Sequence, residues 1–351
     1  MQSIQAMVVK NTIIRFSETA MNPKERIDAI MNGQPYDRSA VTPIFMAWAA
    51  HFVGHSYRDY YLNGEVLVKA QLAVVREFQL DQISAISDPW REAADFGMEF
   101  EYPEQGVGKP VQYLIQTPAD IHKLKSVKIQ DSRRMLQRVQ SVQAMAAAVG
   151  ATHSVLGWVE GPFAEYADLR GVENALIDLM DRPELFQETG IVLVRNAIDF
   201  AIAQIQAGAD MIGIGDAAAS LIGPDLYEQY VLPMEIQLID AIHDAGGCVK
   251  LHICGNINNI LLFMARTGAD IIDLDWMVPL DEARQKVGPN IVLCGNINPT
   301  EIMLQGTPQQ VAEAANECLQ KGGRRFILMP GCEVPPGTPI ENLRALCAAI
   351  L

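Results

Sequence analysis

Short apolar runs alternate with longer helical patterns along most of the chain. The runs are rich in Val, Ile and Leu, and most of them end at a polar residue or a glycine. Near-continuous apolar runs are typical of strands that are buried on both faces of a parallel sheet. We predict eight such strands, over residues 43–48, 81–88, 153–160, 210–216, 248–254, 270–276, 290–296 and 325–331.

Helical patterns fill the intervals between these strands, over residues 65–77, 134–148, 183–207, 225–245, 257–267 and 308–320. Eight strands that alternate with helices predict an α/β fold of the (β/α)8 TIM-barrel type rather than an open, doubly wound sheet. A dinucleotide-binding sheet would require the pattern G-x-G-x-x-G after an early strand. Gly213 and Gly215 fit that pattern, but the third glycine is missing.

Two segments extend the simple barrel pattern. Residues 1–40 are expected to form an N-terminal arm and a helix, with Asn22 as the cap, Pro23 in the first turn and Gly33 as the stop. Residues 89–152 form a long insertion after the second strand, with a hairpin pattern followed by a helix. Such an insertion usually covers the active-site face of a barrel. We expect one domain over residues 1–351.

The composition excludes several classes of protein. The chain has 351 residues, of which 49% are hydrophobic, and a net charge of −15 from 27 Lys and Arg against 42 Asp and Glu. Nucleic-acid binding requires clustered cations, so we expect no nucleic-acid partner. No apolar run approaches the roughly 20 residues of a membrane span, and the first 20 residues lack the pattern of a signal peptide. We therefore expect a cytoplasmic protein without a membrane partner.

Chemistry in such barrels lies at the C-terminal ends of the strands. The predicted strand ends carry Trp48, Asp88, Glu160 and Asp216, which we expect to contact substrate. Asp88 and Asp216 are also candidate catalytic groups: Asp88 as a base or hydrogen-bond acceptor, and Asp216, like Glu160, as a general acid or a further metal ligand. Asp88 could instead cap the segment that Pro89 opens.

The six cysteines all lie in the C-terminal third, which argues against a disulfide framework. His252 and Cys254 are two residues apart on one predicted strand, so their side chains share a face. Cys332, just after the last strand, could add a third soft donor, and this set is typical of catalytic zinc. A hydrogen-bonded core histidine with buried thiols remains an alternative, and Cys294 is a competing ligand.

These residues resemble the uroporphyrinogen decarboxylase superfamily from about Asn22 to the C-terminus. The most specific stretch is residues 330–346 (PGCEVPPGTPIENLRAL), and Gly161-Pro162 and Gly208-Ala209-Asp210 support it. The resemblance implies the same (β/α)8 barrel that the strand pattern predicts.

The superfamily has two main branches, and the chain is more similar to one of them. True decarboxylases carry P-x-W-x-M-R-Q-A-G-R after the first strand, whereas residues 43–56 here read PIFMAWAAHFVGHS and contain no arginine. A tetrapyrrole with eight carboxylates needs guanidinium partners. Decarboxylases also have a histidine where this chain has Cys332. The zinc-dependent, corrinoid-linked methyltransferases carry H-x-C and a distant C, which here fall on His252, Cys254 and Cys332.

The resemblance therefore implies an enzyme that binds Zn²⁺ and moves a methyl group between a corrinoid (cobalamin) and a small methylated substrate or thiol. Methylcobamide:coenzyme M methyltransferases and the methyltransferase units of demethylase systems belong to this branch. The chain lacks the D-x-H-x-x-G pattern of a cobalamin-binding module, so a separate corrinoid-binding protein is expected as partner. Decarboxylation of a porphyrinogen, corrinoid or porphyrin binding without catalysis, and a structural zinc site with a closed fourth ligand remain alternatives.

Overall fold

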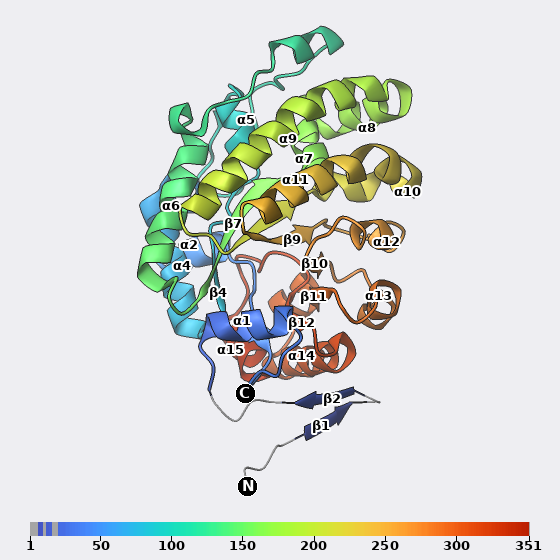
Figure 1. Cartoon of the computed structure of the whole chain (residues 1–351). Coiled ribbons are helices and arrows are strands. Elements are labelled where there is room, and N and C mark those ends of the chain that lie inside the picture. Colours follow the sequence, from blue (N-terminus) through green and yellow to red (C-terminus); the bar gives the residue numbers. More distant parts are fainter. Residues whose placement is uncertain (1–5, 10–11, 16–19, 351) are drawn as a thin grey trace.

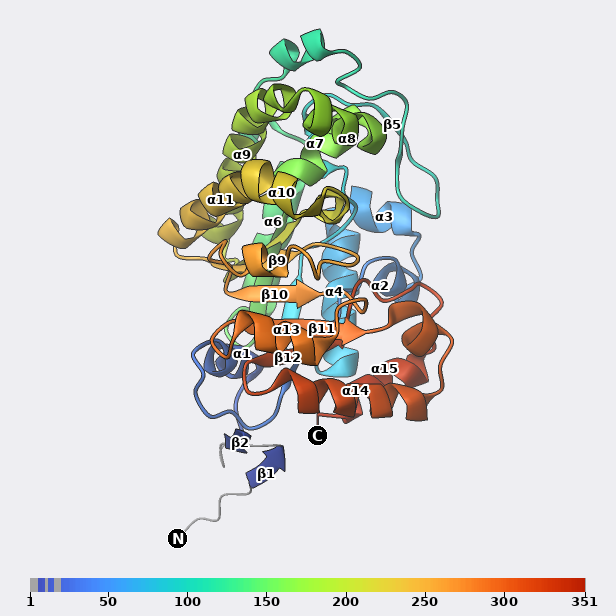
Figure 2. The same ribbon diagram turned by 90° about the vertical axis from the view of Figure 1, so that its right-hand side faces the viewer.

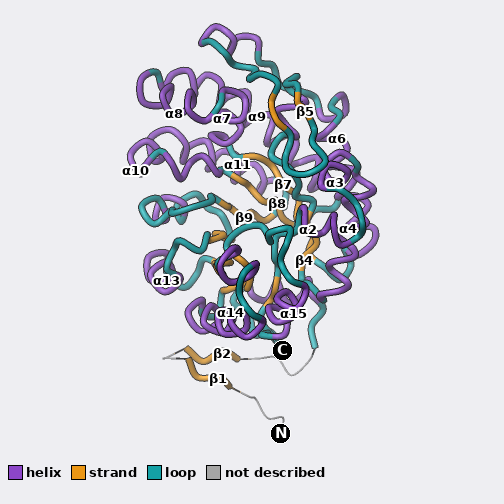
Figure 3. The backbone as a smooth tube through the Cα atoms, turned by 180° about the vertical axis from the view of Figure 1, so that it is seen from behind, coloured by secondary structure: helices purple, strands orange, loops and turns teal. Residues whose placement is uncertain are grey.

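A ring of parallel strands forms the centre of the molecule, and helices surround it (Figures 1 and 3). The computed structural model describes residues 6–9, 12–15 and 20–350. The eight strands of the ring are β3 (Ala40–Val41), β4 (Gln82–Ser84), β7 (Ser154–Glu160), β8 (Met211–Gly215), β9 (Cys248–His252), β10 (Ile271–Leu274), β11 (Val292–Ile297) and β12 (Phe326–Pro330).

These strands pair in the order β3-β12-β11-β10-β9-β8-β7-β4, and every pair is parallel. The two ends of this order are joined next to β4, where the Asp81 N–H donates to the Val41 carbonyl at 3.1 Å. The predicted (β/α)8 barrel is therefore confirmed.

Helices connect successive strands and pack on the outside of the ring. None of those in the described part of the chain has the length and apolar character needed to cross a membrane. The longer helices are α4 (Gly64–Phe78), α6 (Arg134–Val149), α7 (Pro162–Arg170), α8 (Val172–Asp181), α9 (Pro183–Gln206), α11 (Leu232–Asp244), α13 (Leu280–Val287), α14 (Pro308–Gly322) and, after the last strand, α15 (Ile340–Ala348). Shorter elements are α3 (Tyr57–Leu62), the 3₁₀ helix η3 (Ala217–Leu221) and the π-helical turn η5 (Pro299–Leu304).

The predicted first strand over residues 43–48 is wrong. The first strand is β3, in which Ala40 pairs with Ile327 of β12. The apolar run that follows leaves the sheet and enters helix α2 (Ala47–Phe52), so Trp48 lies on a helix and not at a strand end. A buried helix and a buried strand produce the same apolar run in a sequence, and a run this short cannot distinguish them.

Two predicted helices are shorter or interrupted. Residues 257–267 contain only α12 (Leu261–Met264) as α-helix. The helix predicted over 225–245 is divided into α10 (Gly223–Leu226), the π-helical turn η4 (Tyr227–Val231) and α11 (Leu232–Asp244). Pro233 is the second residue of α11, which comes directly after the π-helical turn η4.

The N-terminal helix forms as predicted. α1 (Pro23–Met31) begins with a capping box between Asn22 and Glu25, and Gly33 follows it with a φ of +64°. The predicted arm over residues 1–40 lies partly outside the described residues. Where it is described, β1 (Ala6–Val9) and β2 (Thr12–Arg15) pair in an antiparallel hairpin.

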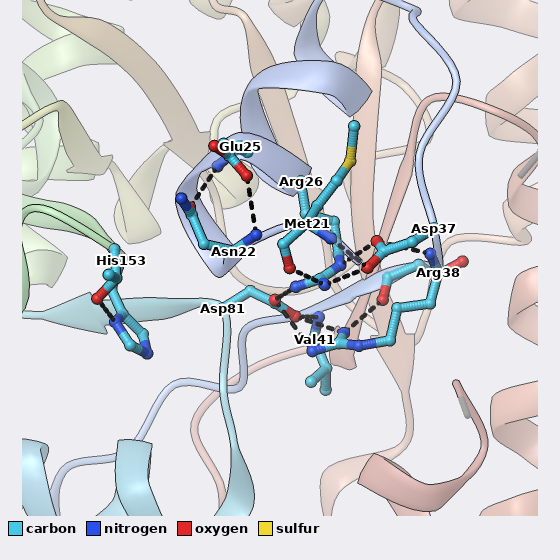
Figure 4. Close-up of polar contacts among 11 residues, drawn as sticks. Met21, Asn22, Glu25, Arg26, Asp37, Arg38, Val41, Asp81 and His153 are labelled. Carbon is cyan, nitrogen blue, oxygen red and sulfur yellow. Dashed lines mark hydrogen bonds and ion pairs between the residues drawn. The ribbon is translucent and has the colours of Figure 1, made fainter. Parts of the chain in front are cut away.

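A network of ion pairs ties α1 to the N-terminal end of the barrel (Figure 4). The fully buried carboxylate of Asp81 accepts hydrogen bonds from Arg26, from Arg38 Nη1 at 2.9 Å and from the Val41 N–H at 2.8 Å. Arg26 Nε also donates to Asp37 Oδ1 at 2.7 Å. Each buried charge is paired, as the low dielectric of the interior requires.

Side chains fill the interior of the barrel. Alternate residues of each strand point inward, and the inward-facing apolar residues form one cluster with Ile27 and Ile30 of α1, which closes the N-terminal end. The interior members of this cluster include Leu156, Trp158, Met211, Cys294, Ile327 and Met329.

The insertion over residues 89–152 lies beside helices α7 to α9 (Figures 1 and 2). The Ile115 N–H donates to the Leu169 carbonyl at 3.0 Å, and the Val127 N–H donates to Asn196 Oδ1 at 3.0 Å. The predicted hairpin is present in a shorter form. Before α6 the insertion contains α5 (Arg91–Asp95), the paired strands β5 (Phe100–Glu101) and β6 (Lys109–Pro110), and the 3₁₀ helices η1 (Pro118–Lys123) and η2 (Ile129–Asp131).

Candidate metal centre

His252, Cys254 and Cys332 come together at the C-terminal end of the barrel. His252 is the last residue of β9 and is buried, and Cys254 follows it by two residues. Cys332 lies two residues beyond β12, after Gly331. A Cβ on Gly331 would lie 2.4 Å from the Trp276 backbone nitrogen, so only glycine permits this close approach of the two loops.

The three side chains present their donor atoms to one point. The ligand atoms of the trio all lie within 4.8 Å of one another. His252 Nε2 is 2.9 Å from Cys254 Sγ, which is 4.0 Å from Cys332 Sγ. Ligands around a tetrahedral zinc ion are separated by about 3.5–3.8 Å, given metal–ligand bonds of about 2.0–2.3 Å. One imidazole and two thiols fit zinc in chemistry, and their separations of 2.9 and 4.0 Å lie on either side of this range.

The trio is also electrostatically coupled. A hydrogen bond from Cys254 holds the pKa of Cys332 at about 4, and the same interaction raises the pKa of Cys254. Burial opposes a charged His252, but the neighbouring Cys254 and Asp273 outweigh it and raise the pKa of His252 well above its usual range. The cluster thus stabilises a thiolate, which is the form that binds a metal.

Two charged residues that the sequence analysis missed lie directly beneath the trio. Asp273 Oδ2 is 3.3 Å from His252 Nδ1 and 3.0 Å from Lys250 Nζ, and both charged side chains are buried. The sequence does carry a signal for them, because each is a charge inside an apolar strand run. Lys250 is also two residues from His252 and so shares its face.

Cys294 is not a member of the trio. It lies on β11 and is 1% exposed, and its register partner on β10 is Asp273. Burial raises the pKa of this thiol. The alternative ligand suggested by the sequence is thus a small residue of the barrel interior.

Asp88 and Glu160 lie in a second buried cluster, at the C-terminal ends of β4 and β7. Asp88 Oδ1 accepts from Arg134 Nη2 at 2.6 Å, and Glu160 Oε1 accepts from Arg91 Nη2 at 2.8 Å. Burial tends to raise the pKa of Asp88, but Arg134 and Arg91 outweigh it and lower that pKa. Burial and nearby Glu92 raise the pKa of Glu160 to about 8, although Arg91 opposes them.

The arginines of this second cluster were not expected from the sequence. Arg91 and Arg138 are fully buried, and Arg134 is 5% exposed. Arg138 Nη2 donates to Ser87 Oγ at 2.9 Å, while its Nε and Nη1 atoms have no hydrogen-bond partner. Arg134 and Arg138 are four residues apart on α6, so they share a helix face. Helical spacing could have paired them, but nothing in the sequence directs that face toward Asp88.

Asp216 contacts the start of helix α7 through its carboxyl group. Its backbone N–H donates to the His252 carbonyl at 3.0 Å, but its carboxyl group accepts from the N–H groups of Ala164 at 2.6 Å and Phe163 at 3.3 Å. Burial raises its pKa to about 7, and Glu235 lies beside it. The structure therefore places Asp216 as a cap of α7.

Trp48, expected to contact substrate, lies in an aromatic cluster. Its ring stacks on Phe52 at a centroid distance of 5.1 Å and lies 5.6 Å from Phe78, and its Nε1 donates to the Thr338 carbonyl at 2.8 Å. The side chain is 6% exposed, and its polar atom is already paired. This position follows from the helix that replaces the predicted strand.

Comparison with known proteins places the whole barrel in one family. The family model described as uroporphyrinogen decarboxylase (URO-D) matches residues 22–350. The chain is 28% identical over 342 residues to methylcobamide:CoM methyltransferase MtbA of Methanosarcina acetivorans, covering 93% of this chain and 97% of that protein. It is 26% identical over 344 residues to uroporphyrinogen decarboxylase of a Roseiflexus species, covering 92% and 96%.

A solved structure shows the same fold. A methyltransferase from Methanosarcina mazei superposes with a TM-score of 0.86 at 24% identity, covering 94% of this chain and 98% of the other. This agreement extends over the barrel and its insertion, so the elements that carry the trio belong to a shared architecture.

Proposed function

The chain belongs to the uroporphyrinogen decarboxylase family, and from this premise we propose that it is a zinc-dependent, corrinoid-linked methyltransferase. It would move a methyl group between a corrinoid on a separate protein and a small methyl donor or thiol acceptor. The observation that carries the proposal is the trio of His252, Cys254 and Cys332, with its ligand atoms within 4.8 Å. Relatives named as methylcobamide:CoM methyltransferases, which align with more than nine-tenths of the chain, support it.

His252, Cys254 and Cys332 would hold the zinc ion and leave a position for the substrate. When bound, zinc would stabilise a substrate thiolate near neutral pH or polarise the bond to a methyl group. Cys254 and Cys332 are half-buried, whereas His252 is buried. The trio is therefore reached from the cysteine side, while His252 anchors it to the barrel.

The corrinoid would approach from outside the mouth of the barrel. The interior is filled by side chains such as Trp158 and Met329, which leaves no space for a macrocycle. The half-buried cysteines lie where a carrier protein could present its cofactor. This arrangement supports a separate corrinoid protein as partner.

Decarboxylation is the second candidate, and it would use the other cluster. Asp88 is held by Arg134 and lies near Arg91, and these guanidinium groups are the kind that bind substrate carboxylates. The relative from Roseiflexus is named as a uroporphyrinogen decarboxylase. This function would be independent of metal, which separates it from methyl transfer.

The decisive experiment measures demethylation of methylcobalamin by visible absorption, with 2-mercaptoethanesulfonate as methyl acceptor. We expect activity in the zinc-loaded chain, loss after chelation, and recovery when zinc is restored. Cys332→Ser should be inactive, while Cys347→Ser, which changes a half-buried thiol outside the trio, should be active. Undiminished transfer by the metal-free chain would contradict the proposal, as would metal-free decarboxylation of uroporphyrinogen without methyl transfer.

A further inference from the structure

Lys250 and Asp273 place two opposite charges inside an otherwise apolar barrel. Lys250 is 2% exposed and Asp273 is fully buried, and Lys250 Nζ lies 3.0 Å from Asp273 Oδ2. Desolvation makes a buried ion pair a poor source of stability, and apolar replacements of similar volume are often neutral or stabilising. A contribution to stability therefore does not explain why this pair lies inside the barrel, and another role is needed.

The register of the sheet places this pair against His252. Lys250 and His252 are two residues apart on β9, so both point inward, while Val249 and Leu251 pack outward in the core beneath the helices. On the neighbouring strand, Asp273 is the register partner of His252. The backbone thus sets the carboxylate beside the imidazole.

The geometry distinguishes the two nitrogens of His252. Nδ1 lies 3.3 Å from Asp273 Oδ2, whereas Nε2 lies 2.9 Å from Cys254 Sγ on the metal side. A hydrogen bond from Nδ1–H to a carboxylate fixes the imidazole tautomer whose Nε2 lone pair is free for a metal. Lys250 contacts the same carboxylate oxygen and holds it in place.

We propose that Asp273 is a positioning residue for His252, and that Lys250 anchors Asp273 in this role. Asp273 orients the ring and directs its Nε2 toward Cys254 and Cys332. This inference rests on the proposed function, because it assumes that the trio binds zinc. Asp273 and Lys250 are not ligands in this proposal. They act on the ligand His252 and so affect how tightly the trio holds zinc.

The test measures zinc affinity by competition with a chelator. In Lys250→Met/Asp273→Leu both charges are replaced by apolar side chains, so the fold is retained but Nδ1 has no acceptor. We expect zinc to bind about 10–100-fold more weakly, as is usual when such a partner of a metal ligand is lost. Asp273→Asn keeps an oxygen acceptor and should lose less. Asp81→Asn, which alters a buried carboxylate at the opposite end of the barrel, is the matched control and should keep wild-type affinity.

A spectroscopic measurement separates positioning from a merely structural role. With cobalt(II) in place of zinc, the intensity of the visible d–d bands reports four-coordinate geometry, and we expect it to decrease in the double variant but not in Asp81→Asn. Wild-type affinity and bands in the double variant would overturn this inference and leave the proposed function intact. A wild type that binds no zinc would overturn both.

Discussion

Buried charges are paired differently at the two ends of the barrel. At the N-terminal end, Asp81 accepts from Arg26, Arg38 and the Val41 N–H, and within the described residues every buried side-chain nitrogen and oxygen of Asp81, Arg26 and Arg38 has a partner. This network joins α1 to the strands, and its buried polar groups are paired without any ligand or partner molecule. It is an end built for stability.

At the C-terminal end the pairing is incomplete. Asp88 Oδ2 and two nitrogens each of Arg134 and Arg138 are buried without a hydrogen-bond partner among the described residues. Unpaired buried groups cost free energy, so they persist where another purpose requires them. The two ends therefore differ in how completely their buried charges are paired: the N-terminal network is closed, whereas buried polar atoms at the C-terminal end stay unpaired.

The largest effect is expected from a substitution that breaks the N-terminal network. Asp81→Asn leaves Arg38 without a counterion and leaves Arg26 with Asp37 alone, and the unfolding free energy should fall by about 3–5 kcal/mol. Urea denaturation measures this loss, and zinc content should not change. A loss below about 1 kcal/mol would show that the network contributes little to stability.

The second expected effect concerns the pH dependence of stability at the C-terminal end. Burial raises the pKa of Glu160 from 4.5 to about 8, so the folded state holds a proton that the unfolded state releases. This contribution to stability is present below pH 4.5 and is lost as the pH rises toward 8, with a slope of at most about 1.4 kcal/mol per pH unit. Glu160→Gln should flatten this part of the stability profile. An unchanged slope in Glu160→Gln would assign the pH dependence to other groups.

A smaller loss of stability is expected when the N-cap of α1, at the N-terminal end, is removed. Asn22→Ala removes the capping box of α1, in which Asn22 accepts from the Glu25 N–H at 3.0 Å. The unfolding free energy should fall by about 1 kcal/mol. Thermal denaturation followed by circular dichroism measures it, and methyl transfer should be unaffected. A loss of activity at unchanged stability would link α1 to the opposite end of the barrel.

The smallest effect is expected where a charge is least well paired. Burial and the nearby Arg91 and Arg134 lower the pKa of Arg138 to about 9, and Arg138 makes one side-chain hydrogen bond, to Ser87. Arg138→Met should therefore leave the unfolding free energy within about 1 kcal/mol of the wild type, or increase it. A loss as large as that of Asp81→Asn, measured under the same urea conditions, would remove the distinction between the two ends.

The barrel could be predicted because its strands are buried on both faces and are read as apolar runs. The first strand was misplaced because β3 has two residues, and the longer apolar run after it belongs to a loop and to helix α2. The trio could be predicted although 78 residues separate Cys254 from Cys332. Strand ends converge in a barrel, and each member of the trio lies at the end of, or just after, a strand that the sequence shows clearly.

The surroundings of the trio were harder to predict. Arg134 reaches Asp88 from a helix 46 residues later in the chain, and no periodicity encodes that contact. Asp216 follows a strand as predicted, yet its side chain turns to cap α7 because free N–H groups lie there. Such details depend on the packing of whole elements. Lys250 and Asp273, in contrast, stand in the sequence as charges within apolar strands, but they were not predicted as part of the site.

The zinc content of the purified chain, measured by mass spectrometry after preparation with excess zinc, tests the central claim most directly. We predict about one zinc ion per chain in the wild type and in Asp81→Asn, and none in Cys332→Ser, with circular dichroism showing that all three are folded. A folded wild type without zinc would contradict the account, as would a Cys332→Ser variant that keeps the full zinc content.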